Sequence, residues 1–148
     1  MAPGLSIRGV ELFASGEYRG RRWTVADLDE MAANCRRLGP RGLRLLAPPA
    51  VLGHEEDQDF LDRTDAPAAA WLNCDSVRVR RYYEPATGRT EGVLVGDLTA
   101  VTPAAAHLIR SGAYRKVSAE IYDDFRDDFG RGYGKALRRV ALLGGEVP

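Results

Sequence analysis

Apolar residues recur every three or four positions in one long segment of the chain. This spacing, from Val25 to Leu38, predicts an amphipathic helix. Thr24 is suited to cap its N-terminus, and Gly39-Pro40 is suited to end it. A second, shorter helix is predicted over residues 103–111, because Thr102-Pro103 combines an N-cap with a proline in the first turn.

The remaining apolar segments alternate with polar residues or form short uninterrupted runs, as strands do. Residues 68–83 and 92–98 flank the turn sequence 85–88 and predict a β-hairpin. Because strands outnumber helices, we predict an α+β, mainly β fold: a small β-barrel of five to seven strands flanked by helices. Further strands are expected at residues 5–13, 50–53, 114–122 and 137–143, and loops at residues 54–59 and 123–134.

Composition narrows the class of protein. The 148 residues fit one domain, and 21 basic against 21 acidic residues argue against a dedicated nucleic-acid binder. The two cysteines, Cys35 and Cys74, allow one disulfide but are too few for a disulfide framework. Cys35 lies on the apolar stripe of the first helix, where a buried free thiol is the favoured interpretation. The sequence has neither a signal peptide nor an apolar run of the ~20 residues that span a bilayer. We therefore expect a soluble, cytoplasmic protein.

The candidate catalytic groups are histidines and serines. His54 directly follows a short apolar strand, where a rigid element could fix a general base. His107 lies on the polar face of the second helix, so we expect it to be solvated. Ser118 lies in a predicted strand, and side chains at positions i and i+2 share a face of a strand. Its face would comprise Lys116, Ser118, Glu120 and Tyr122, opposite Val117, Ala119 and Ile121.

The other serines and the acidic loop favour structural interpretations. Ser6, Ser15, Ser76 and Ser111 lie in turn-like or edge contexts. A metal-dependent hydrolase would need His54 and its acidic neighbours to converge on one ion, which adjacent loop residues rarely do. A solvated acidic loop is therefore the favoured interpretation of Glu55, Glu56, Asp57 and Asp59.

Five segments resemble, in order, the phage prohead proteases, including the Mu-like protease–scaffold proteins. The histidine segment, VLGHEEDQ at residues 51–58, and the serine segment, GAYRKVSAEIY at residues 112–122, are the most specific. The others are residues 13–31, with FASG and WT before the helix; residues 66–72, APAAAWL; and residues 137–148, LRRVALLGGEVP.

This resemblance implies a fold of the herpesvirus-assemblin type, a β-barrel wrapped by helices. It implies a serine endopeptidase that cuts scaffold and major capsid protein precursors inside an immature capsid in the host cytoplasm. His54 would be the base and Ser118 the nucleophile. By analogy with the family we expect a homodimer or higher homo-oligomer. We expect no cofactor, metal, membrane or direct nucleic-acid partner. Residues 1–148 would form a single protease domain, which a scaffold segment follows in protease–scaffold relatives.

One position departs from the family pattern. Arg139 stands where relatives often have a third catalytic histidine or glutamate, and a guanidinium cannot accept an imidazole N–H. We nominate Glu120 as the third member, because it shares the face of Ser118. A Ser–His dyad and a catalytically inactive, protease-like capsid or scaffold component are the alternatives. Arg115 and Arg139 are candidates for holding the oxyanion or, more simply, surface or ion-paired arginines.

Overall fold

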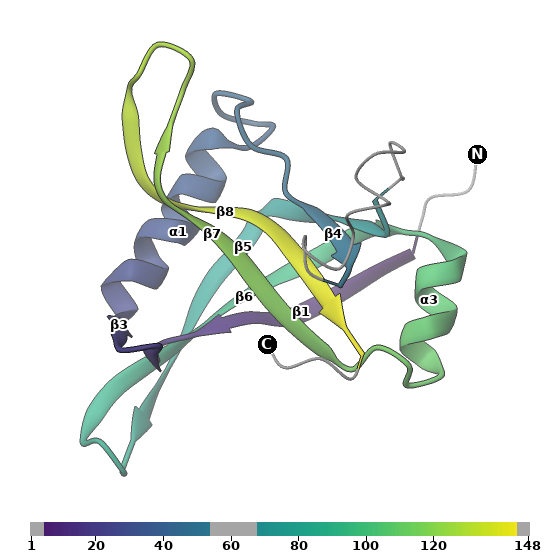
Figure 1. Cartoon of the computed structure of the whole chain (residues 1–148), viewed down its shortest axis with the longest axis horizontal. Helices are drawn as coiled ribbons and strands as arrows, with labels where there is room; N and C mark the ends of the chain where they lie inside the picture. Colours follow the sequence, from purple (N-terminus) through teal and green to yellow (C-terminus); the bar gives the residue numbers. More distant parts are fainter. Residues whose placement is uncertain (1–4, 54–67, 145–148) are drawn as a thin grey trace.

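The computed structural model describes residues 5–53 and 68–144 (Figure 1). Two helices accompany a series of strands in this part of the chain. The elements in order are β1 (Leu5–Ala14), β2 (Gly16–Tyr18), β3 (Arg21–Trp23), α1 (Val25–Leu38), β4 (Pro49–Leu52), β5 (Ala70–Glu84), β6 (Arg89–Val101), α3 (Pro103–Arg110), β7 (Lys116–Arg126) and β8 (Gly132–Leu143).

The main sheet has six strands in the order β1-β6-β5-β4-β8-β7, and β2 pairs separately with β3. Strand β4 joins two antiparallel groups: it is antiparallel to β5 but parallel to β8. Because β4 lies between strands that are distant in sequence, it brings the middle of the chain beside the C-terminal β7–β8 hairpin.

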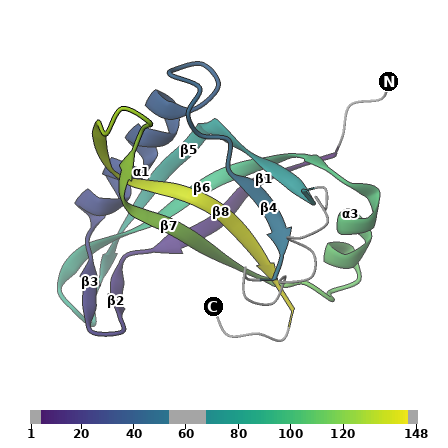
Figure 2. The ribbon, with the colours of Figure 1, turned by 45° about the horizontal axis from the view of Figure 1, so that its top comes forward.

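The predicted α+β, mainly β class is correct, but the predicted β-barrel is wrong. The sheet is open, with β1 and β7 at its two edges. The sheet is strongly coiled, so these strands approach each other, yet no ladder of hydrogen bonds joins them within the described residues (Figure 2). Strand count and alternation were compatible with closure, but closure depends on pairing between the two edges, which periodicity does not encode.

Helix α1 forms as its capping sequence predicts. The Thr24 Oγ1 atom accepts the Asp27 N–H at 3.1 Å, and the Asp27 carboxylate accepts the Thr24 N–H at 2.8 Å. This reciprocal capping box satisfies two N–H groups that a helix otherwise leaves without a partner. The apolar stripe of α1 packs across β5, β6 and β8 and is fully buried at Leu28, Met31, Cys35 and Leu38.

A buried asparagine fixes α1 against β8. Asn34 is 6% exposed, and its Nδ2 atom donates to the backbone oxygens of Tyr133 at 2.8 Å and Lys135 at 2.7 Å. These two bonds satisfy carbonyls of β8 that pair with no other strand within residues 5–53 and 68–144. The side-chain amide thus substitutes for a missing strand at the helix–sheet contact.

The segment predicted as a loop over residues 123–134 is mostly strand. Strand β7 continues to Arg126 and β8 begins at Gly132, so the two form a hairpin that extends beyond the sheet (Figure 1). Asp127 organises its turn by accepting the N–H groups of Phe129 and Arg131, each at 2.9 Å. The short β2–β3 hairpin was likewise not predicted.

The second helix, the burial of the Cys35 thiol and the exposure of His107 are as predicted. Within residues 5–53 and 68–144, no helix is both long and apolar enough to cross a bilayer.

We predict that Asn34→Asp lowers the free energy of unfolding by about 1–3 kcal/mol, because a carboxylate cannot donate to the two carbonyls it would face. Asn73→Asp is the matched control, since the Asn73 side-chain oxygen accepts the Asp75 N–H at 3.1 Å and an aspartate retains that acceptor. Urea denaturation of both variants measures the difference. Equal losses in the two variants would contradict the role given to Asn34.

Candidate functional site

Ser118 lies in a row of side chains that crosses three strands. On β7 it pairs with Ala141 of β8, and Ala141 pairs with Val51 of β4. The neighbouring row, Val117, Leu142 and Leu52, belongs to the core side of the sheet. Ser118 therefore lies on the opposite face, as the i, i+2 pattern predicted, and it is partly buried there.

The Ser118 hydroxyl differs from most other serine hydroxyls of the chain. Among the described residues, none forms a hydrogen bond with the Ser118 hydroxyl. By contrast, the hydroxyls of Ser15, Ser76 and Ser111 donate to Glu91, to the Asn73 backbone oxygen at 2.6 Å and to the Leu108 backbone oxygen at 3.1 Å. Ser6 is exposed on β1. Ser118 thus combines partial burial with a hydroxyl that no described residue engages.

The C-terminal end of β4 lies two strands away from β7. The Gly53 N–H donates to the Leu142 oxygen at 2.9 Å, and Leu142 pairs with Val117, the residue before Ser118. Two strand spacings are about 10 Å. Gly53 has φ +79°, a left-handed conformation that glycine adopts without strain and that turns the chain out of the strand. The predicted base, His54, lies outside the described residues.

Glu120 faces two consecutive arginines of β8. Glu120 pairs with Arg139, whereas the next residue of β7 pairs with Leu137, so Arg138 is an extra residue in a β-bulge. The bulge brings both guanidinium groups near the same carboxylate: Glu120 Oε1 is 3.7 Å from Arg139 Nε and 3.8 Å from Arg138 Nη1. The Glu120 and Arg139 side chains are each 16% exposed. Sequence periodicity predicted the position of Glu120 but not this bulge.

The other residues that the sequence suggested for catalysis or metal binding lie apart from Ser118 and Glu120 or outside the described residues. Arg115 precedes β7, is exposed, and donates from Nε to the Gly112 oxygen at 3.0 Å. Glu55, Glu56, Asp57 and Asp59 lie outside the described residues, as does His54. In the described part of the chain, histidine, cysteine, aspartate and glutamate nowhere form a group of three or more that could hold a metal ion.

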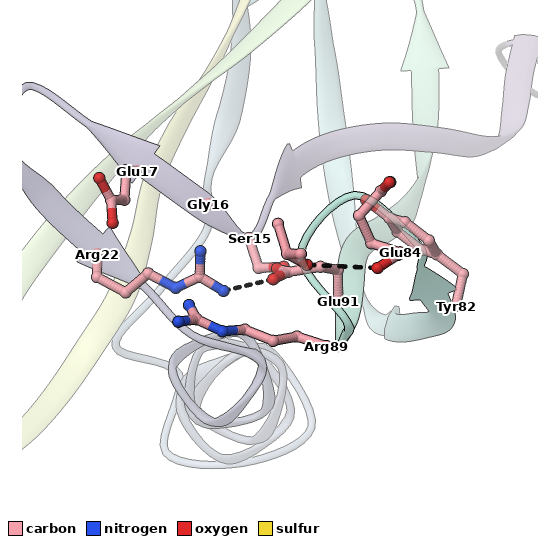
Figure 3. Close-up of a pocket in the computed structure, with 9 residues that line it drawn as sticks. Ser15, Gly16, Glu17, Arg22, Tyr82, Glu84, Arg89 and Glu91 are labelled. Atoms are coloured by element: carbon pink, nitrogen blue, oxygen red, sulfur yellow. Dashed lines mark hydrogen bonds and ion pairs between the residues drawn. The ribbon is translucent and has the colours of Figure 1, made fainter.

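A polar pocket of about 590 Å³ lies at the end of the molecule near the β2–β3 and β5–β6 hairpins (Figure 3). Its centre is Glu91, which is 4% exposed and toward which Ser15 and Arg22 point. Sequence analysis did not find this network, because Ser15 and Glu91 are 76 residues apart. The lining residues are Ser15, Gly16, Glu17, Arg22, Tyr82, Glu84, Thr87, Arg89 and Glu91.

The Glu91 network is fully bonded. The Ser15 hydroxyl donates to Glu91 and accepts the Gly92 N–H at 2.9 Å, while Arg22 forms an ion pair with the other carboxylate oxygen. The hydrogen bond from Ser15 and the interaction with Arg22 hold the pKa of Glu91 below its usual value, against the opposing effect of burial. This network joins the β2–β3 hairpin to β6. The carboxylate that Ser15 contacts is already paired with Arg22, so it is not free to act as a base and activate the Ser15 hydroxyl. We therefore assign the pocket a structural role.

Comparisons with protein-family models, with curated proteins and with solved structures find no match to this chain.

We predict that Glu91→Gln lowers the thermal midpoint at pH 7 and flattens its dependence on pH in the acid range. A carboxylate whose folded-state pKa is depressed contributes stability above its unfolded pKa of about 4.3, and that contribution is lost as the pH falls through the folded value. Differential scanning calorimetry between pH 7 and pH 3 measures both effects.

Glu84→Gln is the control for this prediction. Glu84 lines the same pocket, and its Oε1 atom accepts the Ala86 N–H at 3.1 Å, an interaction that glutamine retains. We expect its midpoint at pH 7 to match that of the wild type. A Glu91→Gln variant as stable as Glu84→Gln at pH 7 would show that the carboxylate charge is dispensable.

Proposed function

We propose that the protein is a serine endopeptidase that processes scaffold and capsid precursor proteins during phage prohead maturation. Ser118 is the nucleophile and His54 its general base. The observation that carries the proposal is the position of the Ser118 hydroxyl, which no described residue engages, two strands from the β4 end that leads directly into His54. The substrate class comes from the family resemblance of the sequence.

The proposed reaction begins when the Ser118 oxygen attacks a peptide carbonyl and transfers its proton to His54. A serine hydroxyl is a weak nucleophile at neutral pH and needs such a base within hydrogen-bond reach. Histidine is neutral above a pH of about 6.5, so activity should rise through that range. His54 then gives the proton to the departing amine, and water hydrolyses the acyl-enzyme and regenerates the serine.

The neighbours of Ser118 support this role. Ala141 and Val51, which share its row, carry only small apolar groups and so neither donate to nor accept from the hydroxyl. Ala141, the neighbour of Ser118 on β8, is fully buried. In these surroundings, the side chains of Ala141 and Val51 do not compete with an imidazole for a hydrogen bond with the Ser118 hydroxyl.

Glu120 is proposed as the carboxylate that orients His54. It lies on the face of Ser118, two pairs further along the β7–β8 ladder, and its Oε1 atom is 3.7 Å from Arg139 Nε and 3.8 Å from Arg138 Nη1. Arg139, at the family's third position, would then act through Glu120 rather than on the imidazole. A bulge that supplies two cations to one carboxylate fixes that carboxylate in place.

A second candidate function is a catalytically inactive, protease-like component of the capsid or scaffold. Arg139 favours it, because this residue type cannot take the role that a histidine or glutamate has at the corresponding position of related proteases. The ion pairs of Glu120 favour it too, since they can be purely structural. Labelling with a fluorophosphonate probe separates the two candidates, because only an activated serine reacts.

We predict that Ser118→Ala abolishes both fluorophosphonate labelling and cleavage of co-expressed scaffold and capsid precursors. Loss of the nucleophile in a serine protease removes a rate gain of ~10⁶, and His54→Ala should have a similar effect. Ser111→Ala is the control, since Ser111 is an exposed serine at the end of α3. Mass spectrometry of the precursors measures cleavage, and unchanged processing by Ser118→Ala would contradict the proposal.

We predict that Glu120→Gln lowers kcat by about 10²–10⁴ with little change in KM, by analogy with the loss of an orienting carboxylate in a triad. The acid limb of the pH–rate profile should move to lower pH, because a nearby carboxylate raises the pKa of an imidazole. Tyr122→Phe, on the same face of β7, is the control. A variant that loses stability but keeps the wild-type pH profile would show that Glu120 is structural only.

A further inference from the structure

The two cysteines of the chain lie together in the core. Cys35, in the last turns of α1, is 0% exposed, and Cys74, on β5, is 2% exposed. Both are free thiols and both belong to the main hydrophobic cluster. Thirty-nine positions (74 minus 35) separate them in sequence, so their proximity is a product of the fold and not of a motif.

The two thiols interact electrostatically. Their side-chain interaction raises the pKa of Cys35, which burial raises further, and lowers the pKa of Cys74. The Cys74 sulfur is therefore the one that becomes the thiolate first. Burial and, less strongly, Asp75 oppose the lowering of the Cys74 pKa, and Arg36 opposes the raising of the Cys35 pKa. A thiolate in contact with a second thiol is the arrangement from which disulfides form.

The glycine that ends α1 makes room for this contact. A Cβ atom added to Gly39 would lie 2.6 Å from the Cys35 backbone oxygen and 2.7 Å from the Cys74 Cβ atom, both too close for real atoms, and a tight 3.1 Å from the Cys74 sulfur. The Gly39 N–H still donates to the Cys35 oxygen at 2.9 Å, so the helix end keeps its hydrogen bond. Cys74 thus packs directly over the turn of α1 that carries Cys35.

The backbone around Cys74 is also able to adjust. The register of the β5–β6 ladder shifts between Asn73 and Arg78, so Cys74 lies in an interruption of regular pairing. Local bonds support this bulge instead: Asp75 N–H to the Asn73 side chain at 3.1 Å, and the Ser76 hydroxyl to the Asn73 oxygen at 2.6 Å. A disulfide needs Cβ atoms roughly 3.5–4.5 Å apart, and an unpaired segment reaches such a geometry with less distortion than a ladder would.

We propose that Cys35 and Cys74 form an intramolecular disulfide when the folded protein meets a peroxide, which connects α1 covalently to β5. The Cys74 thiolate attacks a peroxide oxygen, breaks the O–O bond and becomes a sulfenic acid, and the leaving hydroxide takes a proton to form water. The Cys35 sulfur then attacks the Cys74 sulfur, the S–O bond breaks and a second water leaves. Two thiols are thereby oxidised by two electrons and one peroxide is reduced to two waters.

The expected consequence is a redox-dependent change in stability. The bond would close a loop that contains β4 and the segment after it, and so restrict the unfolded chain more than the folded one. Because both thiols are buried, reaction depends on local opening of the bulge and should be slow compared with that of an exposed thiol. The proposal is independent of the peptidase assignment.

The test is oxidation of the wild-type protein with hydrogen peroxide under native conditions. After quenching, unfolding and treatment with N-ethylmaleimide, the intact mass should be lower by two hydrogens than that of the reduced protein, with no maleimide added. Dithiothreitol should restore two reactive thiols. Oxidised protein should also remain monomeric on a non-reducing gel and melt several degrees higher than reduced protein. Two maleimides on the oxidised sample, or a disulfide-linked dimer, would overturn the proposal.

Single variants identify the order of the steps. In Cys35→Ser, the Cys74 sulfenic acid has no partner thiol, so dimedone should label Cys74. In Cys74→Ser, dimedone labelling of Cys35 should be several-fold weaker. The wild-type mass measurement remains decisive if a variant does not fold. Conversion of wild-type Cys74 to sulfinic or sulfonic acid with Cys35 still free would also overturn the proposal.

Discussion

The fold depends on the pairing of β4 with the strands on both of its sides. Among the strands that the structure describes, this four-residue strand alone connects the β1-β6-β5 group with the β8-β7 hairpin through backbone pairing. Its parallel register with β8 aligns Val51 with Ala141 and so with Ser118, and it directs Gly53 toward the same region. The side chain of Ala50 on β4 is a single methyl group, is fully buried and belongs to the core cluster. Both the core and the candidate site rely on this short contact.

The predictable parts of the fold are those that local chemistry specifies. Helix α1 follows from its periodicity and from Thr24 and Asp27, and α3 follows from Thr102-Pro103. The open edge of the sheet could not be predicted, because it depends on whether two distant strands pair. The β7–β8 hairpin was missed for another reason: its glycines and aspartates are typical of loops, but the packing of Phe125 and Tyr133 beside Leu38 stabilises strand geometry there. Tertiary contacts overrode propensity in that segment.

The candidate site also has a part that the sequence predicted and a part that it did not. Alternation along β7 was sufficient to place Ser118 and Glu120 on one face and the apolar residues on the other. The bulge at Arg138 was not visible, because a one-residue register shift leaves no mark in a strand pattern that is already rich in arginine. Nor could any local signal connect Ser15 and Arg22 with Glu91, since side-chain networks between distant segments have no sequence period. The proposed relation of Ser118 to His54 rests on the resemblance together with the strand order.

Because the sheet is open, it has two edge strands that must be protected from pairing with other chains. An edge strand presents a row of backbone donors and acceptors that another chain can continue, so long regular edges favour polymerisation. Both edges here are irregular: the register of β1 shifts three times along its length, and that of β7 shifts three times against β8. Exposed Asp123, Asp124 and Arg126 add charge to the outer part of β7. Straightening either strand would strengthen its own ladder while offering neighbouring molecules a better template, so solubility sets an upper limit on how regular these edges can become.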